Sequence, residues 1–214
     1  VQNVTVISHG PNNDGCNPES SKNVLIKDCY FDTGDDCIAI KSGRNADGRR
    51  VNVPSENIII QGCTMKDGHG GVVIGSEISG NCRNVFTEDC VMDSPNLERA
   101  LRIKSNSKRG GIVENVFMRN VTVGEVKDAV IRVNFHYSEG DVGQHTPLVR
   151  NIHVNKITSK KSKYAFYFDG YERSPIANIT IENCQFNGVK KDDLINHVSE
   201  LTLKQVYRNG KLQK

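Results

Sequence analysis

A short pattern recurs seven times along this chain and limits what the chain can fold into. Each copy starts with Asn, has apolar residues at +1 and +3, and reaches a small apolar residue at +6 and another apolar residue at +8. The intervals between copies range from 20 to 36 residues, which is typical of a solenoid whose turns differ in loop length. The copies start at Asn3, Asn23, Asn57, Asn84, Asn115, Asn151 and Asn178.

Within a copy, the hydrophobic spacing is that of short strands. The alternation at +1 and +3 slips by one at +4 and +5, usually Asp, Asn or Gly, and resumes at +6 and +8. A third alternating run follows, for example at 71–76 and 100–105, and no helical segment is expected between the strands. The leucine spacing of leucine-rich repeats is missing. We therefore predict an all-β fold: a right-handed parallel β-helix of about seven coils, forming a single domain over 1–214.

The starting Asn of each copy is expected to form a buried interior or corner ladder, with amides bonded from coil to coil. Only the first copy departs at +6, where it has His9. Cysteines recur at +6 and are predicted to be small buried hydrophobes rather than disulfide partners. These four are Cys29, Cys63, Cys90 and Cys184, whereas the state of Cys16, Cys37 and Cys82 is left open.

Composition excludes several classes of function. The net charge is +3 and the basic residues are scattered, so no nucleic-acid partner is expected. No run of 18 apolar residues occurs, and the start VQNVTVISHG has no signal peptide, so no membrane association is expected. Cys-x-x-Cys is absent and His is not clustered near the cysteines, so neither a metal nor a cofactor is predicted.

Long insertions at 44–55, 76–83, 93–100 and 137–150 are expected to project from one face and to form the walls of a binding groove. The tail, 201–214, is expected to be a terminal strand that closes the last turn. No matching cap precedes Val1. We therefore expect the chain to be the C-terminal part of a longer β-helix, with the N-terminal cap and first coils absent.

Three titratable residues lie at nearly the same offset in the first three copies. Asp14 follows the first start by 11 residues, and Asp35 and His69 follow the second and third starts by 12. Because equivalent positions on neighbouring parallel strands are about 4.7–4.9 Å apart, stacked copies should place these side chains in one column.

Further charged residues are predicted to join this column. Asp36 follows Asp35, and Arg102 and Lys104 alternate with core-facing residues of the third run, so both should point outward. Three close carboxylates raise the pKa of at least one of them and leave the others ionised, as a general acid beside a general base requires. Each motif alone is more often a turn or a solvated charge; their coincidence on adjacent coils indicates a site.

Four ordered tripeptides carry these residues: Asn13-Asp14-Gly15, Gly34-Asp35-Asp36, Gly68-His69-Gly70 and Arg102-Ile103-Lys104. Together they resemble the signature motifs of the polygalacturonases, pectin-degrading glycoside hydrolases of family 28. Tyr137, 33 residues after the last motif, matches a tyrosine of that family. The resemblance covers the whole chain. It implies a secreted or periplasmic monomer that acts on polygalacturonate or oligogalacturonides without a cofactor.

The resemblance also implies roles for individual residues. It makes Asp35 the general acid that protonates the glycosidic oxygen, and Asp14 and Asp36 the pair that activates water in an inverting reaction. His69 then tunes the acid or contacts the sugar. By the same resemblance, Arg102 and Lys104 are the pair that binds the galacturonate carboxylate beside the cut, and Tyr137 lines the same subsite.

Departures from the family pattern concern the first motif, a disulfide and the length. The first motif reads Asn-Asn-Asp rather than the commoner Asn-Thr-Asp, which keeps the carboxylate. In fungal relatives a disulfide joins the cysteines equivalent to Cys37 and Cys63. We do not expect this disulfide here. Family members also carry several further coils, so the chain alone could be weak or inactive. The insertion at 44–55 and the tracts around the second and third motifs favour the bacterial exo-acting branch over the endo-acting one.

Several rival functions stay open. A pectate lyase has a similar β-helix but eliminates with calcium and an arginine base. A rhamnogalacturonan or xylogalacturonan hydrolase of the same family is closer, although Arg102 and Lys104 together favour galacturonate at the cleaved bond. A non-catalytic carbohydrate-binding β-helix would bind oligogalacturonate without cutting it.

Overall fold

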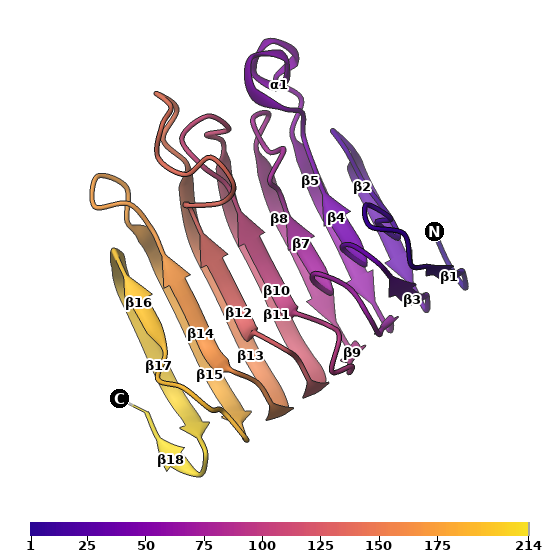
Figure 1. Ribbon diagram of the computed structural model, residues 1–214, viewed down its shortest axis with the longest axis vertical. Coiled ribbons are helices and arrows are strands. Elements are labelled where there is room, and N and C mark those ends of the chain that lie inside the picture. Colours follow the sequence, from indigo (N-terminus) through magenta and orange to yellow (C-terminus); the bar gives the residue numbers. More distant parts are fainter. Residues whose placement is uncertain (214) are drawn as a thin grey trace.

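The computed structural model describes residues 1–213 as a stack of coils built mainly from short and long strands (Figure 1). In chain order the elements are β1 Thr5–Ser8, β2 Lys22–Lys27, β3 Tyr30–Thr33, β4 Ile38–Ile40, α1 Asn45–Val51, β5 Ser55–Gln61, β6 Thr64–Met65, β7 Val72–Ile74, β8 Cys82–Glu88, β9 Val91–Met92, β10 Arg99–Lys104, β11 Ile112–Glu125, β12 Ala129–Asn134, β13 Leu148–Lys161, β14 Tyr164–Asp169, β15 Ile176–Phe186, β16 Leu194–Asn196, β17 Val198–Arg208 and β18 Lys211–Leu212.

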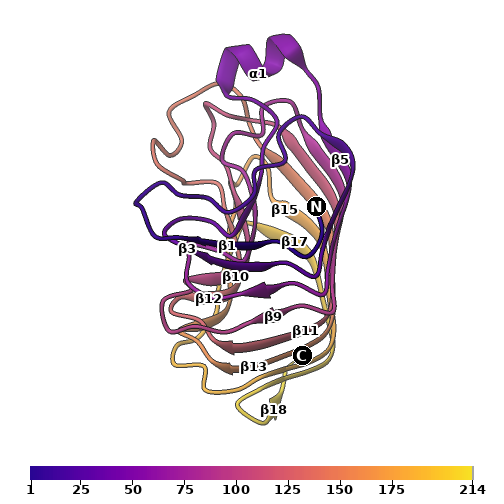
Figure 2. The same cartoon turned by 90° about the vertical axis from the view of Figure 1, so that its right-hand side faces the viewer.

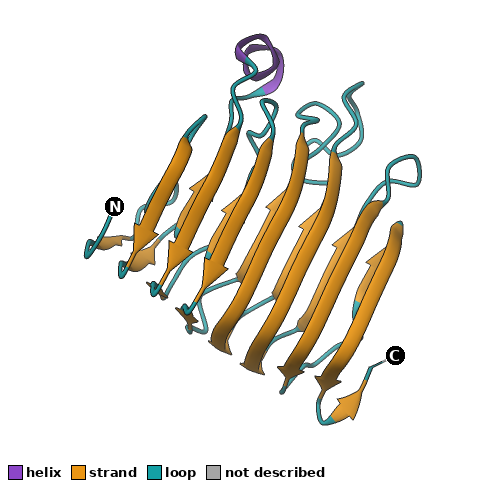
Figure 3. Ribbon diagram, turned by 180° about the vertical axis from the view of Figure 1, so that it is seen from behind, coloured by secondary structure: helices purple, strands orange, loops and turns teal. Residues whose placement is uncertain are grey.

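Two sheets run along the stack, and each strand pairs in parallel with its equivalents on neighbouring coils (Figure 3). The twelve-stranded sheet contains the long strands and their short N-terminal counterparts, and the six-stranded sheet has the order β16-β14-β12-β10-β7-β4. Among the strands of residues 1–213, only the final pair, β17 and β18, is antiparallel. The predicted parallel β-helix is confirmed, as is a terminal strand at the end of the tail. Figure 2 shows the coils stacked from the N-terminal to the C-terminal end.

Each coil bends at the predicted phase slip. The residue five positions after the starting Asn has a positive φ in six coils, at Asp28, Gly62, Asp89, Asn120, Lys156 and Asn183. In the first three of these coils the bend separates two short strands, and in later coils one long strand such as β11 runs through it. The bend shifts the alternation of inward-facing and outward-facing side chains by one residue. Apolar side chains on both sides of the bend therefore face the core.

The starting asparagines form an amide ladder, as predicted. The side-chain Nδ2 of Asn115 donates to Oδ1 of Asn84 at 3.0 Å, and that of Asn151 donates to Oδ1 of Asn115 at 3.0 Å. The prediction that this ladder is buried was wrong, because its members are exposed or half-buried. They stand at an outer corner with φ near +58°, a conformation that Asn tolerates better than most residues.

Asn3 does not belong to this ladder. Thr5 pairs with Tyr30, so Asn3 is level with Asp28, and its φ of 56° is that of the second corner. The sequence pattern therefore assigned Asn3 to the first corner of its coil, although it lies at the second corner. This explains why His9 broke the pattern: Val4, not His9, is level with the +6 residue Cys29.

The interior is one contiguous hydrophobic cluster between the two sheets. The four ladder cysteines are buried within it, as predicted. All seven cysteines are free, so the bond between Cys37 and Cys63 that fungal relatives suggest is not formed.

One insertion contains a helix, which contradicts the expectation of a helix-free chain. Helix α1 lies inside the insertion at 44–55 and projects from the loop edge of the stack (Figure 2). Arg49 donates from Nη1 to the backbone oxygens of Lys108 and Arg109 at 3.0 and 3.1 Å, which fixes the helix against the loop after β10. A helix of about two turns in an insertion leaves no periodic apolar stripe to detect. No helix among residues 1–213 is long and apolar enough to span a membrane.

Candidate active site

The turns that enter the six-stranded sheet carry the predicted carboxylates and histidine. Asp14 lies in the first such turn, Asp35 and Asp36 lie between β3 and β4, and His69 lies between β6 and β7. Cys16 pairs with Ile38, so Asp14 is level with Asp36 rather than with Asp35. The predicted single column is thus two adjacent columns, Asp14 with Asp36 and Asp35 with His69.

Gly34 allows the turn before Asp35 to pack closely on the coil below. A Cβ at this position would lie 2.1 Å from the backbone oxygen of Gly10, so no other residue fits without moving the backbone. The thiol of Cys37 is buried and donates to the backbone oxygen of Asp67, which lies on the next coil, at 3.3 Å. Burial raises the pKa of this thiol to about 12. Packing from both sides therefore fixes the two aspartates.

One carboxylate oxygen of Asp35 has two polar contacts. Its Oδ1 lies 2.9 Å from Nδ1 of His69 and accepts a hydrogen bond from the backbone N of Asp36, also at 2.9 Å. No Lys or Arg forms an ion pair with Asp35 in residues 1–213, and its side chain is 19% exposed. Asp35 is therefore the accessible carboxyl of the group, with an imidazole as its partner.

Asp36 is the most buried carboxyl of the group, at 1% exposure. Lys104 donates from Nζ to its Oδ2 at 2.7 Å, and Nη1 of Arg102 lies 3.7 Å from its Oδ1. Burial raises the pKa of Asp36, whereas the positive charges of Lys104 and Arg102 oppose that rise. Oδ1 has no hydrogen-bond partner among residues 1–213, so its lone pairs are free to accept a proton.

Asp14 has a separate cationic partner that sequence reasoning missed. Lys41 donates from Nζ to Oδ2 of Asp14 at 2.8 Å, and the backbone N of Asp36 donates to Oδ1 of Asp14 at 3.2 Å. Burial acts to lower the pKa of Lys41, but its hydrogen bond to Asp14 and nearby carboxylates outweigh this and raise it. Lys41 follows Ile40 as Lys104 follows Ile103, and the two isoleucines are equivalent in the stack. This equivalence could have identified Lys41 as a site residue from the sequence.

Strand β10 brings the predicted cations to the carboxylates. Arg102 pairs with Val73 and Val73 with Ala39, which confirms the predicted alignment of the third runs. The ring of Tyr137, in the loop after β12, has its centroid 5.4 Å from Cζ of Arg102 and 5.2 Å from Nζ of Lys104. All seven predicted site residues therefore meet in one place.

On the intervening coil, Gly70 lies between Asp36 and Arg102. A Cβ on Gly70 would lie 3.7 Å from Oδ1 of Asp36, 3.6 Å from Cβ of Arg102 and only 2.4 Å from Cγ2 of Val73. The absence of a side chain at Gly70 thus keeps the space between carboxylate and guanidinium open.

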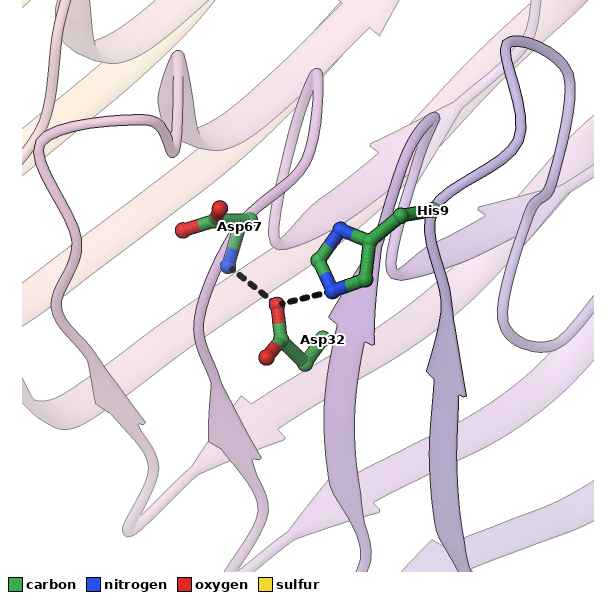
Figure 4. Close-up of side chains that lie close together, drawn as sticks. All are labelled: His9, Asp32 and Asp67. Carbon is green, nitrogen blue, oxygen red and sulfur yellow. Dashed lines mark hydrogen bonds and ion pairs between the residues drawn. The ribbon is translucent and has the colours of Figure 1, made fainter.

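Figure 4 shows a second polar group, made by His9, Asp32 and Asp67. Nε2 of His9 lies 3.2 Å from Oδ1 of Asp32, and the backbone N of Asp67 donates to that same oxygen at 3.4 Å. Asp67 in turn accepts hydrogen bonds from Ser94 and Asn96. These residues flank the turns of Asp35 and His69, and sequence reasoning did not select them.

Two groups of side chains are compact enough to hold a cation. They are His9 with Asp32 and Asp67, and Asp35 with Asp36 and His69, each with ligand atoms within 4.8 Å of one another. In the second group, the ammonium group of Lys104 already neutralises Asp36. In the first, protein donors bond both carboxylates. Neither donor set favours a divalent cation.

Comparison with known sequences identifies the family. A model of the family described as Glycosyl hydrolases family 28 matches residues 1–205. This chain belongs to that family. A probable polygalacturonase from Vitis vinifera is 31% identical over 195 residues, which are 86% of this chain and 38% of the relative. A polygalacturonase from Ralstonia solanacearum is 31% identical over 186 residues, covering 83% of this chain and 33% of the relative.

Comparison of structures agrees with the family assignment. The structure of a hyperthermoactive exopolygalacturonase from Thermotoga maritima superposes with a TM-score of 0.95 at 42% identity, covering 99% of this chain and 47% of that one. The family 28 chain thus spans about a third of these curated relatives and about half of the Thermotoga enzyme.

Proposed function

We propose that this chain hydrolyses α-1,4-galacturonosidic bonds of polygalacturonate and acts from a chain end. The observation that carries the proposal is the meeting of three carboxylates with fixed cations: Asp36 contacts Lys104 at 2.7 Å and Arg102 at 3.7 Å. A glycosidase needs a carboxyl pair, and an anionic sugar needs cations beside the cleaved bond. The similarity to the Thermotoga exopolygalacturonase supports the same substrate and exo action.

In the proposed mechanism Asp35 is the general acid. It is the carboxyl without a Lys or Arg partner in residues 1–213, and its imidazole neighbour His69 orients it through the 2.9 Å contact. The proton of Asp35 passes to the glycosidic oxygen as the bond to the anomeric carbon breaks. His69 acts here as a positioning residue, because its contact is to Asp35.

Asp36 and Asp14 are the proposed base pair. Lys104 contacts Asp36 and Lys41 contacts Asp14, and the pKa of Asp36, raised by burial, makes its carboxylate a better proton acceptor. The free Oδ1 of Asp36 accepts a proton from the attacking water, which approaches opposite the leaving group. Attack by water inverts the anomeric carbon.

Arg102, Lys104 and Tyr137 are proposed to bind the sugar carboxylate beside the cut. Lys104 is bonded to Asp36 in this structure, so substrate binding must divide its hydrogen bonds between two carboxylates. An ammonium group has three donors and can serve both. A polymeric substrate also fits secretion outside the cell or into the periplasm, which we propose as the location.

The decisive experiment is incubation with polygalacturonate while reducing ends and product sizes are followed. Release of galacturonate monomer is expected for exo action, and mixed oligomers would instead indicate endo action. NMR of the fresh product tests the mechanism, since retention of configuration would exclude direct attack by water. Unsaturated products, or loss of activity with a chelator, would point to a lyase. Binding of the polymer without any cleavage would refute the hydrolase proposal for this chain.

A further inference from the structure

The turns that enter the six-stranded sheet carry different charged residues on the first and the last coils. On the first coils these turns carry the carboxylates Asp14, Asp35 and Asp36. On the last coils they carry lysines beside aspartates: one lysine next to Asp128 between β11 and β12, one lysine between β13 and β14, and two lysines next to Asp192 and Asp193 between β15 and β16. We call these four residues the lysine stripe: Lys127, Lys163, Lys190 and Lys191.

The lysine stripe is continuous in space. The backbone N of Lys163 donates to the oxygen of Asp128 at 2.9 Å, and that of Lys191 donates to the oxygen of Lys163 at 2.9 Å, so the three turns are adjacent coils. All four lysines line one hollow of about 320 Å³. Lys127 also lines the neighbouring hollow of about 230 Å³, together with His69. The stripe therefore begins at the edge of the candidate active site.

These lysines have no carboxylate partner in the part of the chain that the structure describes. By contrast, Lys41 and Lys161 are paired with Asp14 and Glu125 at 2.8 and 2.6 Å. Nearby acidic residues have other partners: Asp128 pairs with Arg99 and Arg132, Glu125 with Lys161, and Asp192 and Asp193 with Arg208. Like charges repeated on adjacent coils repel one another, and a bound chain of negative charges would relieve that repulsion.

We propose that the lysine stripe binds the polyuronide chain beyond the cleavage site, so that the substrate leaves the site toward the C-terminal coils. The proposal rests on the proposed function for its ligand, an unbranched polymer with one carboxylate per sugar. It assigns a direction because the four lysines all lie on coils C-terminal to Asp35 and Asp36, whereas the equivalent turn of the first coil carries Asp14, which repels such a chain. Lysines suit this role because they attract successive carboxylates as point charges without fixing one geometry.

The test compares two double variants with the same change of charge. Lys163→Glu/Lys191→Glu reverses the stripe, and Lys156→Glu/Lys211→Glu reverses two other lysines, both exposed. Each is combined with Asp35→Asn, so that the polymer stays intact, and binding to polygalacturonate and to its neutral methyl ester is measured against salt. The stripe variant should lose on the order of tenfold in affinity at low salt, and much less at high salt, with the control near wild type.

Three results would overturn the proposal: unchanged affinity in the stripe variant, equal losses in both double variants, or equally stripe-dependent binding of single-stranded DNA. Lys163→Gln/Lys191→Gln, which removes charge without reversing it, should give a smaller loss in the same direction, and circular dichroism checks that all variants fold. With Asp35 intact, the stripe variant should raise KM for polymer but not for digalacturonate. A wild type that binds through the stripe and cleaves neither substrate would refute the hydrolase function while supporting the stripe.

Discussion

Lys104 donates a 2.7 Å hydrogen bond to Asp36, 68 residues earlier in the chain and on the far side of an intervening coil. The two side chains are nearly buried, at 9% and 2% exposure. Burial raises the pKa of Asp36 and the ammonium group opposes that rise, so the pair sets the pH at which this carboxylate becomes ionised.

We therefore expect Lys104→Gln to move the acid limb of the pH profile. The base form of Asp36 must be ionised, so activity is lost as pH falls through its pKa. Removing the ammonium group lets that pKa rise further, and the half-maximal point of kcat/KM on the acid side should move to higher pH. Lys108→Gln, on an exposed loop lysine, is the control. If the half-maximal pH on the acid side were unchanged or lower in the Lys104 variant, this result would contradict the assignment of Asp36 as base.

Asp35→Asn is expected to lower kcat by about 10²- to 10⁴-fold, because the amide cannot protonate the leaving oxygen. The fold should be unaffected, since the amide can still accept from His69 and from the backbone N of Asp36. Asp47→Asn, on the exposed face of α1, removes a carboxylate far from the site and should leave kcat unchanged. Full turnover by the Asp35 variant would exclude this residue as the acid.

Much of this site could be predicted from the sequence because coil geometry repeats. Alternation along the third run placed Arg102 and Lys104 on the outer face, and the same equivalence could have revealed Lys41 as the partner of Asp14. The first copy was placed one corner too early because Asn recurs at both corners, where positive φ favours it equally. Counting from Asn3 therefore did not give the true neighbour of Asp14, which is Asp36.

Other features could not be predicted from a repeat. The short helix α1 lies in an insertion and is held by contacts from Arg49 to a loop some 60 residues away. The group of His9, Asp32 and Asp67 joins turns of three coils through the side-chain directions of residues that each look like ordinary turn formers. Long-range partners of this kind follow from the stacking register, which the sequence pattern defines only approximately.

Gly70→Ala should impair catalysis through the space it fills. The added Cβ would meet Cγ2 of Val73 at 2.4 Å and approach Asp36 and Arg102, so kcat/KM should fall by roughly tenfold, with a stability loss of about 1–3 kcal/mol from overpacking. Val73→Ala in the same chain removes the clashing methyl group. The double variant should therefore be more stable than additivity of the two single changes predicts. Additive losses in thermal unfolding would show that Gly70 is not constrained by Val73.

Asn115 allows the two contributions of the corner ladder to be separated. Its φ is 58°, its Nδ2 donates to Asn84 and its Oδ1 accepts from Asn151, both at 3.0 Å. Asn115→Gly keeps the left-handed backbone accessible but loses both amide bonds, at about 0.5–1.5 kcal/mol each. Asn115→Ala loses the same bonds and adds about 1 kcal/mol of backbone strain, so it should unfold at lower denaturant concentration than the glycine variant. Equal midpoints, or an alanine variant more stable than glycine, would mean that the positive φ is not maintained by this corner.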